Sequence, residues 1–349
     1  MESLNLDEVK TVLEGIIDIH TEVNIAKNLD SVDGNTINLT LNYPAASYHQ
    51  VLKDEIISKI PSAEVNIATK INTYTTQTGV DKLPEVKNII AVASGKGGVG
   101  KSTTAVNLAL ALQAEGAKVA ILDADIYGPS QPRMLGVSKI KPETTGEGKL
   151  LPVLGHGMQS MSIGFLVDEE NPMIWRGPMV TQALEQMLRD TLWRKVDYMI
   201  IDLPPGTGDI QLTMSQKIPV SGSVVVTTPQ DIALIDAKKG LKMFEKVNIP
   251  ILGIIENMSM HICSNCGNEE EIFGVGGGKS MAGEAGVNFL GALPLEMGIR
   301  LNSDNGIPSV VKDPDGRITE IYKEIARKTT AKLSLQDKEV AAFPNITIE

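Results

Sequence analysis

A glycine-rich segment that carries two lysines and three hydroxyl residues is the clearest chemical signal in this sequence. It reads Ser94-Gly95-Lys96-Gly97-Gly98-Val99-Gly100-Lys101-Ser102-Thr103 and follows an apolar run at residues 88–93. Its first glycine and its final Gly-Lys-Ser satisfy the spacing G-x-x-x-x-G-K-[ST] of a phosphate-binding loop, and the residues after it have helical periodicity. Backbone N–H groups of such a loop, at a helix N-terminus, face a phosphate.

This spacing assigns the loop residues to a nucleotide. We expect Lys101 to contact the β- and γ-phosphates and the Ser102 hydroxyl to ligate Mg²⁺. The other residues that we expect to line the phosphates are Gly95, Gly97, Gly98, Val99, Gly100 and Thr103.

Lys96 adds a second basic side chain directly after the first glycine. A nucleotide already held by Lys101 leaves little room for it within one subunit. This favours a partner subunit. The alternative is an ordinary solvated lysine on the loop.

Carboxylates follow two other apolar runs. Asp202 ends the run at residues 198–201, a position from which a carboxylate holds Mg²⁺, usually through water. Residues 204–209, Pro-Pro-Gly-Thr-Gly-Asp, have the composition of a mobile loop that senses the γ-phosphate. After another run, we expect Asp123 in the metal shell and Asp125 beside the attacking water. Helix or turn capping is the alternative for both aspartates.

Cys263 and Cys266 are the two cysteines of the chain. A C-x-x-C pair followed by glycine forms a tight knuckle whose thiolates face one soft metal. A zinc ion or a [4Fe-4S] cluster usually takes about four protein ligands, so a second copy of the chain would most simply supply the missing two. Four interpretations stay open: a bridging iron–sulfur cluster, which we favour, a bridging zinc, a dithiol redox pair, or structural thiols.

The elements that must position these residues alternate along the chain. Apolar runs lie at residues 88–93, 119–122, 198–201, 223–228, 251–255 and 289–294. Helical stretches separate them, which is typical of an α/β fold with a mostly parallel sheet covered by helices on both faces. Ligands of such folds lie at the carboxyl ends of the strands, where Asn257 and Pro294 also fall.

The chain also divides by composition. Residues 1–74 have the pattern of a small α/β module, with a helix over residues 48–60 that stops at Pro61. Residues 75–86 are polar and aperiodic, and we expect a linker there. The nucleotide domain then covers residues 87–335, and residues 336–349 form a tail.

A second glycine-rich segment, residues 273–280, also ends in Gly-Lys-Ser. Phe273 occupies the place of the first glycine of a phosphate loop. We therefore expect a flexible loop before a short helix.

Composition excludes several partners. The chain has 349 residues and a formal net charge of −11, which argues against tight binding to nucleic acid or to an anionic membrane. No run of about 18 apolar residues is present, and the N-terminus lacks a basic, apolar signal region. We expect a cytoplasmic protein with no nucleic-acid and no membrane partner, in a compartment that disfavours disulfides.

Five motifs in combination resemble the bacterial Mrp/ApbC family of iron–sulfur carrier ATPases. They are the loop at residues 94–103, Leu-Asp-Ala-Asp-Ile-Tyr-Gly-Pro-Ser at 122–130, Trp-Arg-Gly-Pro-Met at 175–179, Asp-Leu-Pro-Pro-Gly-Thr-Gly-Asp at 202–209, and Glu-Asn-Met-Ser at 256–259 before C-x-x-C. The resemblance extends over about residues 87–330.

This resemblance implies a homodimeric ATPase that binds ATP and Mg²⁺ and holds a labile [4Fe-4S] cluster between its subunits. Cluster-assembly scaffolds and apo iron–sulfur proteins would be its partners. It implies that Lys96 crosses to the other subunit's phosphates, like an arginine finger in trans, and that Asn257 and the loop at Pro294 recognise the adenine edge. Residues 1–74 resemble cytosolic iron–sulfur assembly factors but lack their Asp-Pro-Glu motif and reactive cysteine.

The main alternative is a positioning ATPase of the ParA/MinD type with a structural zinc at the cysteine pair. Such a switch works on DNA or a membrane and would need a basic surface or a basic amphipathic C-terminal helix. Residues 333–343 are instead short and mixed in charge. A reductase component related to the nitrogenase iron protein ranks last, because its cysteines lie far apart in sequence.

Overall fold

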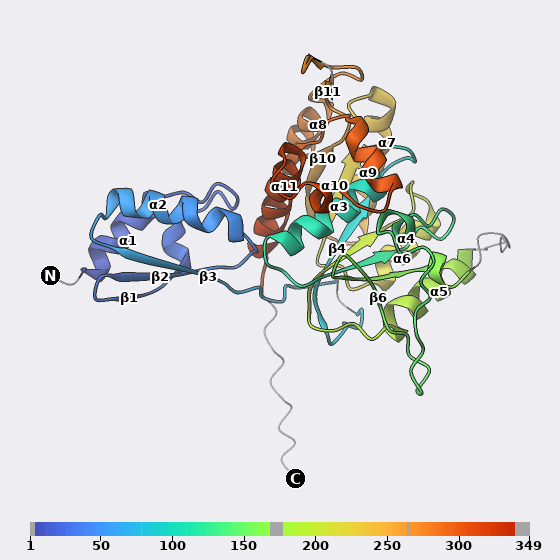
Figure 1. Cartoon of the computed structure of the whole chain (residues 1–349), viewed down its shortest axis with the longest axis horizontal. Coiled ribbons are helices and arrows are strands. Elements are labelled where there is room, and N and C mark those ends of the chain that lie inside the picture. The colour runs from blue at the N-terminus through green and yellow to red at the C-terminus, as the bar shows by residue number, and fades with distance from the viewer. Residues whose placement is uncertain (1–3, 78, 168–176, 264–265, 339–349) are drawn as a thin grey trace, which may run out of the picture.

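The computed structural model describes residues 4–77, 79–167, 177–263 and 266–338. Trp175 and Arg176 of the Trp-Arg-Gly-Pro-Met motif, and tail residues 339–349, lie outside these ranges. Two sheets, each with its own apolar core, organise the described part of the chain. Figure 1 shows the smaller sheet projecting to one side of the larger one, next to helix α11.

The larger sheet has eight strands in the order β13-β10-β9-β4-β8-β5-β7-β6. All neighbouring strands are parallel except β6 and β7. The strands are β4 (Val86–Ala93), β5 (Val119–Asp123), β6 (Val153–Gly155), β7 (Met158–Ser162), β8 (Val196–Asp202), β9 (Gly222–Thr227), β10 (Ile251–Glu256) and β13 (Phe289–Ala292). The predicted fold class, a mostly parallel sheet in an α/β domain, is confirmed.

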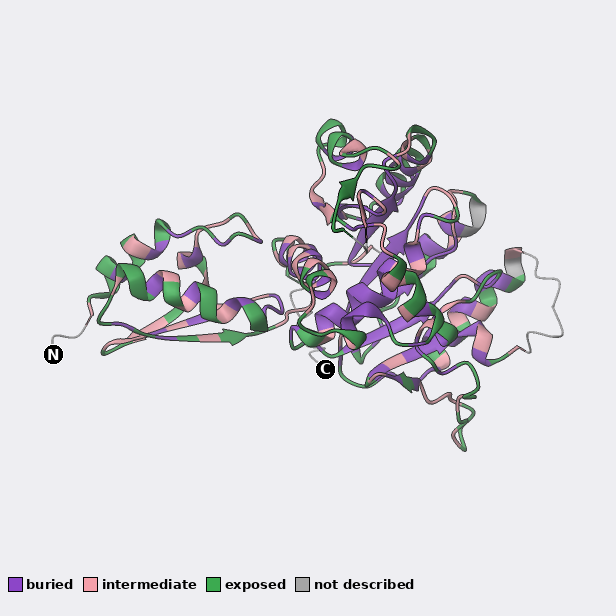
Figure 2. Ribbon diagram, turned by 45° about the horizontal axis from the view of Figure 1, so that its top comes forward, coloured by how far each residue is buried: buried purple, intermediate pink, exposed green. Residues whose placement is uncertain are grey.

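Helices cover this sheet, and the apolar strands lie between them (Figure 2). They are α3 (Lys101–Ala114), α4 (Gln131–Met134), η3 (Ile163–Phe165), α5 (Gly177–Asp190), α6 (Asp209–Lys217), α7 (Asp231–Lys246), α8 (Gly277–Ala285), α9 (Met297–Asp304), α10 (Ser309–Lys312) and α11 (Arg317–Ser334). All residues of β5 and β9 are buried, as expected for strands covered on both faces.

The antiparallel edge formed by β6 and β7 was not predicted. Both strands are short, and β7 (Met-Gln-Ser-Met-Ser) has few of the β-branched and aromatic residues that mark strands. The predicted run at residues 289–294 also ends early, because β13 stops at Ala292 and Pro294 lies in the loop beyond it.

The smaller sheet contains β1 (Leu29–Asp33), β2 (Thr36–Leu41) and β3 (Glu64–Thr69), with β1–β2 antiparallel and β2–β3 parallel. Alternate residues of β2 are buried beneath α1 (Leu6–Glu14) and α2 (His49–Lys59), with short turns η1 (Ile25–Asn28) and η2 (Ala46–Tyr48) between. Ala331 of α11 completes this core. The helix α11 therefore packs against both parts of the chain.

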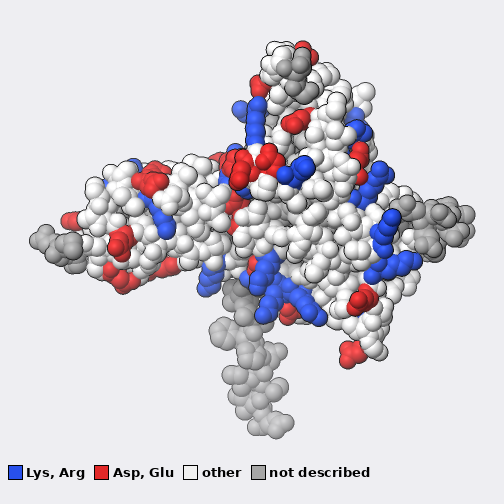
Figure 3. Space-filling view, viewed as in Figure 1, with Lys and Arg blue, Asp and Glu red and all other residues white. Residues whose placement is uncertain are grey.

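Residues after the small sheet meet the end of the chain. Tyr74 forms an isolated bridge with Lys338, and Thr75 N–H donates to Asp337 O at 3.2 Å. A two-stranded hairpin, β11 (His261–Ile262) with β12 (Glu269–Glu270), stands apart from both sheets. On the face drawn in Figure 3, acidic and basic side chains lie in small mixed groups.

Candidate functional site

The glycine-rich loop joins β4 to α3, as predicted from the spacing. Gly98 and Gly100 have φ angles of 82° and 80°, a conformation that glycine adopts at little cost. Gly100 is the N-cap of α3 and no side chain caps that end, so the first N–H groups of the helix face outward for an anion. A Cβ on Gly95 would lie 2.1 Å from the Asp236 backbone carbon, because α7 packs against the loop.

Lys96 is half-buried in this loop, and its carbonyl oxygen accepts a 2.9 Å hydrogen bond from Ser94 Oγ. That bond fixes the backbone at Lys96. The reach of the Lys96 side chain toward a second subunit stays a prediction.

Asn257 lies against the loop from the end of β10. Its Nδ2 donates to Val99 O at 2.8 Å, and a Cβ on Gly100 would lie 2.1 Å from the same nitrogen. The asparagine therefore supports the phosphate loop and requires glycine at position 100. Its contact with adenine stays a prediction.

Lys101 lies within a cluster of oxygen atoms. Its side chain is only 6% exposed, forms an ion pair with Asp202 and lies 3.9 Å from Asp125 Oδ2. Its Nζ also donates to Ser102 Oγ at 3.2 Å. The structure thus brings four of the predicted residues together, with the lysine held by carboxylates that a triphosphate would compete with.

Asp123 and Asp202 face each other across adjacent strands β5 and β8, and both are fully buried. Burial and the charge of Asp202 raise the pKa of Asp123 to about 7. Burial also raises the pKa of Asp125, partly offset by Lys101. A cation beside two neighbouring carboxylates favours the ionised form of both, so the pair suits a divalent metal.

The Asp123 carboxylate is also held by its own loop. Its Oδ2 accepts hydrogen bonds from Ser130 N (3.0 Å), Gln131 N (3.1 Å) and Ser162 Oγ (3.0 Å). These bonds leave Asp123 less free than Asp125 to contact a ligand. Its place in the metal shell stays a prediction.

Gln131 was missed from the sequence. Its Nε2 donates to Asp202 Oδ2 at 2.8 Å and to Ser102 O at 3.1 Å, so it connects the acidic strand end to the phosphate loop. Glutamine carries no motif at this spacing, and no sequence signal would have identified it.

The predicted switch loop after Asp202 is tied to the phosphate loop by its backbone. Gly206 N donates to Ser94 O at 2.9 Å, and Gln211 Nε2 donates to Pro205 O at 2.6 Å. A ligand that moves one loop will therefore displace the other.

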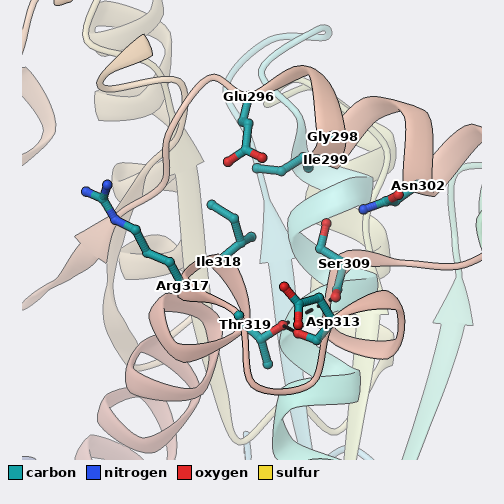
Figure 4. Close-up of a pocket in the computed structure, with 10 residues that line it drawn as sticks. Glu296, Gly298, Ile299, Asn302, Ser309, Asp313, Arg317, Ile318 and Thr319 are labelled. Carbon is teal, nitrogen blue, oxygen red and sulfur yellow. Dashed lines mark hydrogen bonds between the residues drawn. The ribbon is translucent and has the colours of Figure 1, made fainter. Parts of the chain in front are cut away.

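A polar pocket of about 230 Å³ opens just after Pro294, and Figure 4 shows its residues. It lies between α9, α10 and the start of α11, beside α3. Val310 N–H of α10 donates to Asn107 Oδ1 of α3 at 3.2 Å, which joins these two helices. The Ser309 hydroxyl is buried and has no hydrogen-bond partner among the residues that the structure describes. The lining residues are Glu296, Gly298, Ile299, Asn302, Ser309, Asp313, Gly316, Arg317, Ile318 and Thr319.

The cysteines lie in the hairpin turn between β11 and β12. Cys263 N donates to Asn268 O and Gly267 N donates to Cys263 O, both at 2.9 Å, and Gly267 has φ 71°. This closes the knuckle predicted from C-x-x-C-G. Cys266 is exposed, Cys263 is half-buried, and neither is in a disulfide.

The described part of one chain does not complete a metal site here. Within residues 4–77, 79–167, 177–263 and 266–338, no three His, Cys, Asp or Glu side chains lie close enough together to hold a metal ion. His261 Nδ1 lies instead 3.0 Å from Leu295 O, in hydrogen-bond contact. Any metal at the cysteine pair needs further ligands.

The second glycine-rich segment is occupied by a carboxylate of the protein itself. Glu256 is buried and accepts hydrogen bonds from Gly276 N at 3.1 Å and Gly278 N at 2.5 Å. These N–H groups open α8, where a phosphate would otherwise bind. The resemblance to a phosphate loop is therefore superficial, and a short helix follows as predicted.

Comparison with known proteins agrees with this geometry. Residues 85–330 match the family model described as ParA, NUBPL iron-transfer P-loop NTPase. The chain belongs to this family. The "Iron-sulfur cluster carrier protein" of Salmonella typhimurium is 57% identical over 275 residues, covering 79% of this chain and 73% of the relative. A protein of the same name from Synechocystis sp. is 41% identical over 352 residues, covering 95% and 99%.

Solved structures agree on the fold of the NTPase part. A nucleotide-binding protein of Archaeoglobus fulgidus in complex with ADP has a TM-score of 0.56 at 37% identity, over 64% of this chain and 87% of that one. The cell division ATPase MinD of Pyrococcus furiosus has a TM-score of 0.53 at 22% identity, over 70% and 98%, and shares the fold. None of the helices in the described part of this chain has the length and apolar character of a membrane span.

Proposed function

We propose that this protein is a homodimeric cytoplasmic ATPase that carries a [4Fe-4S] cluster between its subunits and delivers it to apoproteins. One observation carries the proposal: the cysteine hairpin and the nucleotide edge of the sheet are paired through their backbones. Leu295 N donates to Met260 O at 2.8 Å, and His261 forms a bridge with Leu295. Pro294 and the polar pocket flank that bridge.

In this proposal the phosphate loop binds ATP and the buried acids complete the site. Lys101 exchanges its carboxylate partners for the β- and γ-phosphates, and Ser102 with Asp202 holds Mg²⁺, which would neutralise charge on the phosphates. The Gln131 Oε1 acceptor, which has no partner among the described residues, and the raised pKa of Asp123 beside Asp202 fit a hydrated divalent cation. Asp125 orients the attacking water, and Lys96 of a second subunit stabilises the departing γ-phosphate.

We place the adenosine part in the pocket after Pro294. The carboxylates of Glu296 and Asp313 line this pocket together with Arg317, so it offers acceptors to an amino group or to ribose hydroxyls. The buried Ser309 hydroxyl lacks a partner in the described structure, and a bound nucleoside would supply one.

The cluster is cargo in this scheme. Two thiols from each subunit supply the four that a [4Fe-4S] cluster takes, and the exposure of Cys266 suits transfer to another protein. Cluster-assembly scaffolds would load the site and apo iron–sulfur proteins would empty it.

We also propose the domain limits that follow from this scheme. Residues 1–74 are an accessory module, residues 75–86 a linker, residues 87–335 the ATPase and residues 336–349 a tail. The two apolar cores support two modules, with Ala331 of α11 packing in the small core and Tyr74 and Leu83 packing in the large one.

Anaerobic reconstitution with iron and sulfide tests the cluster. We expect a broad visible charge-transfer band and about four iron and four sulfide per dimer. Cys266→Ala should lose the cluster and keep its fold, whereas Ser280→Ala, an exposed change on the neighbouring α8, should retain it. A Cys266→Ala variant that keeps its cluster contradicts the bridging site.

The same preparation separates the proposal from its main alternative. Stoichiometric zinc with no retained iron would make the cysteine pair a structural clamp. A positioning switch of the ParA/MinD type would then be the favoured function.

A further inference from the structure

Gln131 is a neutral side chain that contacts both residues assigned to magnesium. It is 1% exposed and opens the short helix α4. Its Nε2 donates to Asp202 Oδ2 at 2.8 Å and to Ser102 O at 3.1 Å, and its backbone N–H donates to Asp123 Oδ2 at 3.1 Å.

The other end of this amide has no partner. Gln131 Oε1 is buried and accepts no hydrogen bond in the described structure, and the nearby Ser130 Oγ is likewise unpartnered. The amide cannot rotate to satisfy Oε1, because that would place an oxygen against the Asp202 carboxylate. Since the two polar atoms of an amide lie about 2.3 Å apart, Oε1 is within roughly 5 Å of Asp202 Oδ2.

That placement suits a water molecule on a metal ion. Magnesium usually keeps several of its waters when bound by one or two carboxylates. A buried acceptor with no donor among the described residues, beside the carboxylate that we assign to the metal, would be a partner for one such water. Residues that orient metal ligands in this way change metal affinity when altered.

We propose that Gln131 is a positioning residue for magnesium: its Nε2 fixes Asp202 against the Ser102 segment, and its Oε1 accepts a hydrogen bond from a water of the hydrated ion. This assignment rests on the proposed ATPase function. It concerns a residue that acts through Asp202 and water and touches no reacting atom.

The test is a magnesium titration of the full-length protein. Gln131→Met keeps the length of the side chain and removes both polar atoms. Binding of a fluorescent, non-hydrolysable ATP analogue is measured without metal and over a range of Mg²⁺. We expect the half-saturating Mg²⁺ concentration to rise about 10- to 100-fold, with metal-free affinity and melting temperature close to wild type. High Mg²⁺ should restore hydrolysis.

A matched control is Gln113→Met. Gln113 also donates one amide hydrogen bond, to His156 O at 3.1 Å, and has a buried, unpartnered Oε1, but it lies at the other end of α3. Its Mg²⁺ dependence should match wild type. If Gln131→Met folds poorly, Gln131→Asn, which keeps the amide but is too short to reach Asp202, should show the same rise.

Three results would overturn the assignment. A half-saturating Mg²⁺ concentration within twofold of wild type would exclude a magnesium role for Gln131. An equal shift in Gln113→Met would reduce the effect to general packing. If wild type itself binds the nucleotide without any Mg²⁺ dependence, the proposed ATPase site fails, and the role of Gln131 fails with it.

Discussion

The helix α3 has a buried charge cluster at each end, and the two clusters are built differently. At its N-terminal end lies the phosphate-loop cluster: Lys101, Asp123, Asp125 and Asp202. At its C-terminal end lies the junction cluster, where α3, α11 and the small sheet module meet: Glu115, Arg327, Glu320, Glu324, His20 and Ser47.

The phosphate-loop cluster is incompletely matched. Burial and the charge of Asp202 raise the pKa of Asp123 to about 7, and the Gln131 Oε1 acceptor has no hydrogen-bond partner among the described residues. A cation or a phosphate with its metal would complete it. This end of α3 is organised for a ligand.

The junction cluster is matched within the protein. Arg327 is 5% exposed. Its guanidinium donates to Glu115 Oε1 at 2.8 Å, to Glu320 Oε1 at 2.6 Å and to Glu324 Oε2 at 2.9 Å. Hydrogen bonding to His20 is the largest of the effects that hold the pKa of Glu324 well below its usual range. Glu115 would otherwise be unfavourable at a helix C-terminus.

The two clusters show that buried charge has two different roles in this fold. A buried cluster whose charged groups pair with one another joins two parts of the chain, here the small module and the NTPase domain. A cluster with raised acid pKa values and an orphaned acceptor marks a binding site.

The largest expected effect is at the joint. Arg327→Met removes the cation from three carboxylates, and breaking a buried pair in this way costs about 3–5 kcal/mol. We expect that loss in the free energy of unfolding from urea denaturation. A loss below about 1 kcal/mol would mean that the junction cluster does not hold the module.

Compared with Arg327→Met, Lys101→Met should lower the free energy of unfolding less and the rate of ATP turnover more. The phosphate-loop cluster can take up a proton when its lysine is lost, since the pKa of Asp123 is already about 7. We expect a smaller loss in unfolding free energy than for Arg327→Met, and a fall in ATP turnover of about 10²-fold or more. Unchanged turnover would remove the phosphate loop from the proposed reaction.

The junction should also respond to pH through His20. Burial alone would lower the pKa of His20, but hydrogen bonds to Asp18 and Glu324 outweigh it and raise the pKa. Tyr43 and Arg327 also contact the ring. A raised histidine pKa stabilises the fold below about pH 6.5, and this stability is lost as pH rises through the folded pKa.

His20→Gln tests that sign. The difference in unfolding free energy between wild type and variant should be larger near pH 5.5 than near pH 8.5, on either side of the ordinary histidine pKa of about 6.5. A difference that grows with pH would show that His20 is held neutral by Arg327.

The smallest effect is expected at an exposed pair. Arg300 lies 3.3 Å from Asp304 on α9, with side chains 68% and 47% exposed. Arg300→Ala should cost only about 0.3–0.5 kcal/mol, as i,i+4 surface pairs do. A loss as large as that of Arg327→Met would end the distinction between matched buried charge and surface charge.

Several features of this protein can be predicted from short segments of its sequence. The strand, loop and helix around Lys101 follow from spacing and periodicity within a short segment. The aspartates at strand ends and the C-x-x-C-Gly knuckle are likewise local patterns, and the parallel sheet follows from the repetition of apolar runs.

Contacts between residues far apart in the sequence depend on how the elements pack. Gln131 bridges Asp202 and Ser102, Arg327 joins Glu115 to the small module, and Leu295 pairs with the cysteine hairpin. Glutamine, arginine and leucine are ordinary surface or core residues at these spacings. Their roles arise because strand order and helix packing bring segments far apart in sequence into hydrogen-bond distance, and no local pattern encodes that order.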